Sequence, residues 1–145
     1  MIREWFIGFH KPVLKPRLMF GHCEAWGSDG DTWTFIDPQG AGLKIYTRFR
    51  YDDVRAELQA RLDLCHLILV ARADREFRLP LHGPMTCAAI CGSLVGIRAL
   101  IPPTLRRSLL ANGAEVFHDP EGKFSGQSRA PAGTPHGRTG PDTGG

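Results

Sequence analysis

The chain has 145 residues, of which 42% are hydrophobic and 23% charged, and its formal net charge is +3. This length and composition predict one globular domain that buries its own core, and they exclude a disordered chain. The longest apolar stretch, 85–101, is interrupted by Arg98 and two glycines, so it falls short of a membrane span. No signal peptide is recognisable, which favours a cytoplasmic protein. The arginines are scattered along the chain rather than clustered, so we expect no nucleic-acid partner.

The first half of the chain predicts a small antiparallel sheet. Short apolar and β-branched runs bounded by turn residues favour strands at 5–9, 18–26, 32–37, 43–47, 64–71 and 75–79. Ser28 to Asp31, which joins the second strand to the third, is typical of a tight hairpin turn. A helix is predicted over 51–62, because acidic residues occupy its first turn and apolar residues recur every fourth position.

The second half predicts helices followed by a tail. Thr86 is a good N-cap for an apolar helix that starts at Cys87 and ends near Gly96. We expect Pro102-Pro103 to break the chain before a short basic helix over 105–112, and a last strand over 114–118. The predicted fold is one α+β domain over 1–118, with a helix packed on one face of the sheet. Residues 119–145 carry few large apolar side chains and predict a disordered tail.

The four cysteines, Cys23, Cys65, Cys87 and Cys91, lack the regular spacing of a disulfide framework. Cys87 and Cys91 lie four residues apart on one helical face, and His22 with Cys23 could complete a metal site. Structural zinc sites have closer C-x-x-C spacing, which does not occur here. We therefore expect neither a metal nor another cofactor, and we interpret Cys65 and Cys91 as small core residues.

Cys87 and His22 have the local settings that a nucleophile and its base require. A thiolate is stabilised by the start of a helix and by a neighbouring imidazole, and Cys87 stands at the start of the predicted apolar helix. If Asp29 and Gly30 are the central residues of the hairpin turn, His22 lies opposite Asp37, Glu24 opposite Phe35 and Trp26 opposite Trp33. Opposed β-carbons lie about 5 Å apart on one face, so Asp37 can orient the His22 ring. The position of Cys87 relative to this pair does not follow from spacing.

Other interpretations of these residues remain open. A cysteine that begins an apolar helix is often only a core residue, and a histidine in a strand often has no catalytic role. Asp37 precedes a proline and can simply cap a turn. His66, in the predicted central strand, and His82, close before the Cys87 helix, are alternative bases.

The order of these elements resembles the circularly permuted NlpC/P60-type group of papain-like cysteine hydrolases. The resemblance is carried by Gly21-His22, the strand Trp33 to Pro38, Met85-Thr86-Cys87, Gly96-Ile97 and the helix start at Pro103 to Leu105. The segments are also similar to small uncharacterised phage and bacterial proteins. In this group the histidine precedes the cysteine.

The resemblance implies Cys87 as nucleophile, His22 as base and Asp37 as the polar residue that orients the base. It further implies attack on an amide, ester or thioester, with a peptide, cell-wall or lipid substrate that the sequence does not specify. A non-catalytic phage or bacterial interaction protein with the same fold is the alternative.

Overall fold

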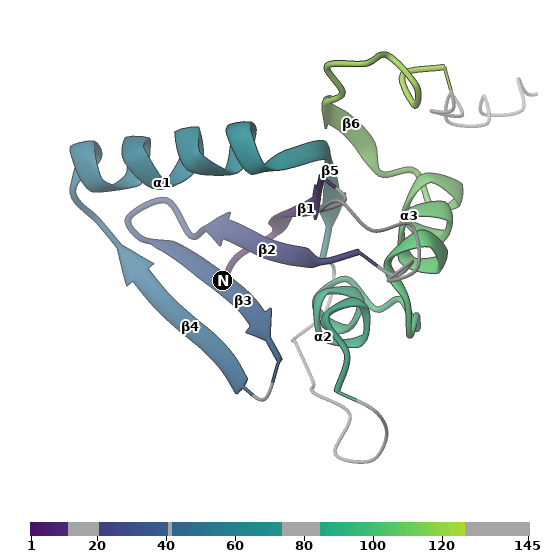
Figure 1. Ribbon diagram of the computed structural model, residues 1–145. Helices are drawn as coiled ribbons and strands as arrows, with labels where there is room; N and C mark the ends of the chain where they lie inside the picture. Colours follow the sequence, from purple (N-terminus) through teal and green to yellow (C-terminus); the bar gives the residue numbers. More distant parts are fainter. Residues whose placement is uncertain (12–20, 41, 74–84, 127–145) are drawn as a thin grey trace, which may run out of the picture.

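The computed structural model describes residues 1–11, 21–40, 42–73 and 85–126, and these form a six-stranded antiparallel sheet with three helices (Figure 1). The strands are β1 (Glu4–His10), β2 (Cys23–Ser28), β3 (Trp33–Gln39), β4 (Gly42–Arg48), β5 (Cys65–Arg72) and β6 (Glu115–His118). The helices are α1 (Tyr51–Leu64), α2 (Cys87–Leu94) and α3 (Pro102–Ala111). The expected α+β class with an antiparallel sheet is confirmed.

Helices cover both faces of the sheet, whose strand order is β4-β3-β2-β1-β5-β6. On one face, Ile7 and Leu69 pack in a core with residues of α2 and α3 such as Ala88 and Leu105. On the opposite face, a smaller core centred on Phe35 packs against α1. Figure 1 shows α1 alone on one side of the sheet and α2 and α3 together on the other. The helix that starts at Cys87 therefore packs on one face, as expected.

The hairpin between β2 and β3 differs from the prediction in its register. Trp26 lies opposite Phe35, and Ser28 lies opposite Trp33, so the pairing is displaced by two residues from the expected one. The turn is longer than two residues because the Asp29 side chain stabilises a wider loop. Its carboxylate accepts hydrogen bonds from the backbone N–H groups of Asp31 and Thr32. A displacement of two residues leaves every side chain on its expected face of the sheet.

A β-bulge interrupts the pairing of β1 with β5. Phe9 lies opposite Leu67 and His10 lies opposite Cys65, so His66 is the additional residue. The His66 ring donates a hydrogen bond from Nδ1 to the backbone carbonyl of His10, with a length of 2.9 Å. A bulge changes the direction of the side chains beside it, and here Cys65 packs with the core on the α1 face.

The prolines at the start of α3 correct another expectation. Pro102 and Pro103 occupy the first turn of α3, with Ile101 as the N-cap, so they begin the helix instead of preceding it. Proline fits the first turn because its missing N–H would have no partner inside the helix and its φ is already helical. None of the helices in the described ranges is long and apolar enough to cross a bilayer.

Some expectations fall on parts of the chain that the structure does not describe. The predicted strand 75–79, most of the predicted tail and the first residues of the predicted strand 18–26 lie outside the described residues. The chain is described as far as residue 126, and a turn there is held by Asp119, whose carboxylate accepts a hydrogen bond of 2.7 Å from the backbone N–H of Phe124. The division at residue 118 stays a prediction.

Candidate active site

His22, which lies just before the start of strand β2, is joined to Asp37 of β3 by a hydrogen bond. The distance from His22 Nε2 to Asp37 Oδ1 is 2.8 Å, and Gln39 donates a hydrogen bond to the other oxygen of the same carboxylate. His22 precedes the first residue of β2 and follows Gly21, whose φ of +60° suits glycine. Continued into this region, the observed register makes Asp37 a diagonal neighbour of His22 on the same face. The expected contact therefore forms through a different register.

Cys87 is the first residue of α2 and lies near His22, the histidine of this pair. Thr86 is the N-cap, as the sequence predicts, and its side chain accepts a hydrogen bond of 3.0 Å from the backbone N–H of Ala89. The Cys87 thiol lies near the His22 ring and the Cys23 thiol, close enough for Cys87 to raise the pKa of His22 and for Cys23 to raise the pKa of Cys87. Since Nε2 of His22 is bonded to Asp37, Nδ1 is the nitrogen that is left to accept the thiol proton. The structure thus brings together Cys87, His22 and Asp37.

The electrostatics of the three residues differ. The hydrogen bond with Cys87 raises the pKa of His22 above its usual value, although burial opposes this. Burial acts to raise the pKa of Asp37, but the hydrogen bonds from His22 and Gln39 outweigh it and lower that pKa. Asp37 is therefore an anion at neutral pH, and it favours an imidazole that carries its proton on the nitrogen facing the carboxylate.

Cys87 is held as a thiol rather than as the thiolate that a helix start and an imidazole would favour. Contact with the Cys23 side chain, together with burial, raises the pKa of Cys87 to about 12, against the lowering influence of His22. A resting thiolate–imidazolium pair is therefore not stabilised, so a reaction of this thiol as a nucleophile would require its proton to move to a base as sulfur attacks.

Removal of the Cys23 side chain is expected to make Cys87 more reactive. In Cys23→Ala the contact that contributes most to the raised pKa of Cys87 is lost, so the thiolate fraction increases at every pH below that pKa. The pH profile of Cys87 alkylation by iodoacetamide, followed by peptide mass spectrometry, should move to lower pH. Cys91→Ala is the matched control, because Cys91 contacts Cys23 and belongs to the same core. An unchanged profile in Cys23→Ala would exclude Cys23 as the cause.

The other candidate histidines are placed differently. The His66 ring is bonded to a backbone carbonyl in the bulge and lies beside Phe124, so it is not the residue that contacts Cys87. His82 lies outside the described residues. Cys65 and Cys91 are fully buried, as expected for core residues.

A second histidine–carboxylate pair, which the sequence did not suggest, lies beside the first. His10 Nε2 is 3.0 Å from Glu24 Oε1, and the other oxygen of Glu24 is 3.1 Å from Nη2 of Arg61, a residue of α1. The side chains of Glu24 and Arg61 are only 4% and 6% exposed. The sequence did contain one indication, since Glu24 lies two residues before Trp26 and therefore on the same face of the strand, which places a carboxylate beside a large aromatic side chain.

His10, Glu24 and Cys65 are the one group among the described residues with the ligand types and proximity for a metal ion, their ligand atoms lying within 4.8 Å of one another. Both oxygens of Glu24 already have partners, and one of them is the guanidinium of Arg61. Burial raises the pKa of Cys65 to about 12, which favours the neutral thiol. The carboxylate of Glu24 is therefore already occupied by His10 and Arg61.

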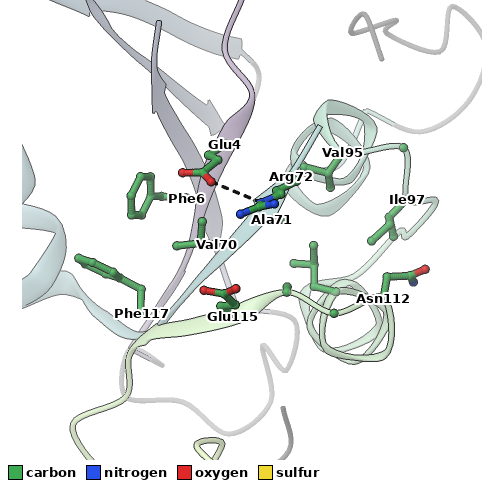
Figure 2. A pocket seen from close by; sticks show the side chains of 14 residues that line it. Glu4, Phe6, Val70, Ala71, Arg72, Val95, Ile97, Asn112, Glu115 and Phe117 are labelled. Carbon is green, nitrogen blue, oxygen red and sulfur yellow. Dashed lines mark ion pairs between the residues drawn. The ribbon is translucent and has the colours of Figure 1, made fainter. Parts of the chain in front are cut away.

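A cleft among the described residues lies elsewhere. It measures about 570 Å³ and lies between β1, β5 and β6 and the carboxyl ends of α2 and α3. Figure 2 shows Phe6, Val70 and Phe117 on one side of it and an ion pair between Glu4 and Arg72 at its edge. Its lining does not include Cys87, His22 or Asp37, so it is separate from the candidate site.

Comparison with known proteins does not assign the chain to a family. No family model, no curated protein and no solved structure matches it. The function is therefore argued from the geometry and chemistry of the site.

Proposed function

We propose that this protein is a cysteine hydrolase or acyltransferase of the circularly permuted papain-like type. The observation that carries the proposal is the hydrogen bond between Asp37 and His22, with Cys87 at the start of α2 near enough to the His22 ring to perturb its pKa. These are the roles of orienting residue, base and nucleophile in thiol-dependent acyl transfer. The order of the residues along the chain and the packing of α2 on the strand that His22 precedes agree with the permuted arrangement.

The proposed reaction begins with attack by Cys87 Sγ on the carbonyl carbon of an amide, ester or thioester. The thiol proton passes to His22 as the S–C bond forms, and His22 then gives it to the leaving amine, alcohol or thiol. The resulting acyl-enzyme is released by water in a hydrolase or by an acceptor amine or alcohol in an acyltransferase. Asp37 holds the His22 ring and stabilises its positive charge in the transition state. The backbone N–H of Cys87, in the first turn of α2, has no partner inside the helix and is a donor for the developing oxyanion.

A non-catalytic interaction protein remains the second candidate. It is favoured by one observation, the raised pKa of Cys87, because a resting thiol is less reactive than a thiolate. The two candidates differ in what they require of His22. An enzyme needs the imidazole to assist the thiol, whereas an interaction protein needs only a folded surface.

The test is the reaction of Cys87 with iodoacetamide and with p-nitrophenyl acetate in wild type, His22→Ala and Asp37→Asn. We expect an acetyl adduct on Cys87 in the wild type and a loss of roughly 100-fold or more in its rate of formation in His22→Ala, since the general base is absent. Asp37→Asn should also react slowly, because the amide keeps the shape of the carboxylate but not its charge. Peptide mass spectrometry locates the adduct and measures its rate.

His118→Ala is the matched control, since His118 lies on β6 at the edge of the sheet, two strands away from β1. It should react as the wild type does. If Cys87 reacts only after the protein is unfolded, it is a core cysteine, the enzyme hypothesis fails and the interaction protein is favoured.

A further inference from the structure

We infer that His10 is a positioning residue for His22, held in place by the buried ion pair of Glu24 with Arg61. The inference rests on the proposed function, because positioning of His22 matters for reactivity only if His22 serves Cys87. It adds a second histidine and two charged residues, none of them suggested by the sequence, to the three residues of the candidate site.

The contacts between the two histidines are direct. The imidazole rings of His10 and His22 meet edge to face, with centroids 4.7 Å apart and an angle of 84° between the ring planes. Their backbones are also joined, since the N–H of His10 donates a hydrogen bond of 2.9 Å to the carbonyl of His22. The His22 ring is thus confined by the His10 ring, while its Nε2 is fixed by Asp37 at 2.8 Å.

His10 is itself fixed from behind by charged groups. Its Nε2 bonds to Glu24, and Glu24 is paired with Arg61, whose Nη1 also lies 2.8 Å from Glu57 Oε2. Arg61 donates a further hydrogen bond of 2.8 Å to the hydroxyl of Tyr46 on β4. Charged groups with several buried partners have few alternative positions. The fixed ring of His10 therefore restricts the movement of His22, whose side chain is 30% exposed.

The titratable and charged groups around the two rings are divided between them. Asp37, on β3, and Cys87, on α2, face His22, with Cys23 behind Cys87. The groups around His10 are Glu24 on β2, Arg61 on α1 and Cys65 on β5. A positive charge on His10 opposes a positive charge on His22 and so lowers the pKa of His22. Loss of the His10 ring therefore removes a ring contact from the base and also removes an influence that lowers the pKa of His22.

The experiment compares His10→Ala and His10→Gln with His22→Ala and the control His118→Ala in the full chain. Two quantities are measured: the pH titration of the His22 ring by NMR, and the rate of Cys87 alkylation by iodoacetamide. In His10→Ala we expect the midpoint of the His22 titration to rise and Cys87 alkylation to fall roughly 10- to 100-fold, the size of effect that a displacement of about 1 Å produces in a catalytic group. His10→Gln keeps a donor for Glu24, so it serves where His10→Ala does not fold.

The outcomes separate this inference from the proposed function. An altered His22 titration with slower alkylation in the His10 variants, and wild-type behaviour in His118→Ala, supports it. If His22→Ala slows alkylation and both folded His10 variants behave as wild type, the inference is overturned and the proposed function stands. If Cys87 is inert in the wild type, the proposed function fails and His10 loses its assigned role, whereas its contact with His22 is still decided by the NMR titration.

Discussion

Replacement of Cys87 by alanine is expected to abolish acyl transfer and to leave the fold intact. Loss of the nucleophile of a comparable triad lowers turnover by roughly 10⁴- to 10⁶-fold, so Cys87→Ala should show only the background rate with p-nitrophenyl acetate. The free energy of unfolding should change by about 1 kcal/mol, because Cys87 is a small, partly buried side chain in the first turn of α2. The rate of acyl transfer is measured by quenching the reaction at set times and quantifying the acetyl adduct by mass spectrometry. The free energy of unfolding is measured by urea unfolding.

Cys91→Ala provides the control for this experiment. Cys91 lies on the same helix four residues further on and is fully buried, so its removal tests the loss of a thiol from α2 outside the triad. We expect Cys91→Ala to lose some stability and to retain acyl transfer. Activity that survives in Cys87→Ala and disappears in Cys91→Ala would place the nucleophile elsewhere.

Replacement of Arg61 by methionine is expected to cause the largest loss of stability. Arg61 is the cation beside Glu24, and both side chains are nearly inaccessible to solvent. Removal of Arg61 leaves Glu24 as a buried carboxylate with a bond to His10 but no cation beside it. Loss of one member of a buried ion pair costs about 3–5 kcal/mol. Urea unfolding followed by tryptophan fluorescence measures this loss, and Trp26, which packs near the Arg61 guanidinium, is a suitable reporter.

A double variant and a surface control make the test specific. Glu24→Gln combined with Arg61→Met removes both charges and keeps a hydrogen-bonding group for His10, so most of the stability should return. Arg72→Met breaks a pair with Glu4 in which the two side chains are 79% and 54% exposed, and it should change stability by less than about 1 kcal/mol. Equal losses of unfolding free energy in Arg61→Met and Arg72→Met would show that the buried pair of Arg61 with Glu24 stabilises the fold no more than a surface pair does.

The local elements of the fold were predictable from the sequence because they depend on neighbouring residues. Patterns within a few residues predict the cap at Thr86, the alternating strands and a helix over 51–62, which the structure extends to Tyr51–Leu64. The contact of His22 with Asp37 was also anticipated, since it requires only that both residues share one face of a hairpin. The register itself was wrong because Asp29 builds a longer turn through its carboxylate.

The remaining features depend on residues that are distant in the chain. His10 reaches Glu24 and Cys65 because β1 lies between β2 and β5, an arrangement that no short pattern encodes. Arg61 reaches Glu24 only because α1 packs on the face of the sheet that carries the Glu24 side chain. The influence of Cys23 on Cys87 likewise depends on how α2 is docked. Sequence reasoning thus anticipated the contact of His22 with Asp37 and named Cys87 as a candidate, but it missed His10, Glu24 and Arg61 beside them.

The strand order has a consequence for the time at which the site becomes complete during folding. His22 and Asp37 are brought together by a single hairpin, and hairpins form in about 1–10 μs. Cys87 joins them only when α2 docks on the sheet, a step that closes a much longer loop of the chain and is expected to be slower. A chain in which α2 has not docked therefore lacks the proximity of Cys87 to His22. Reactivity that depends on both residues would report the last stage of folding, at which α2 takes its place.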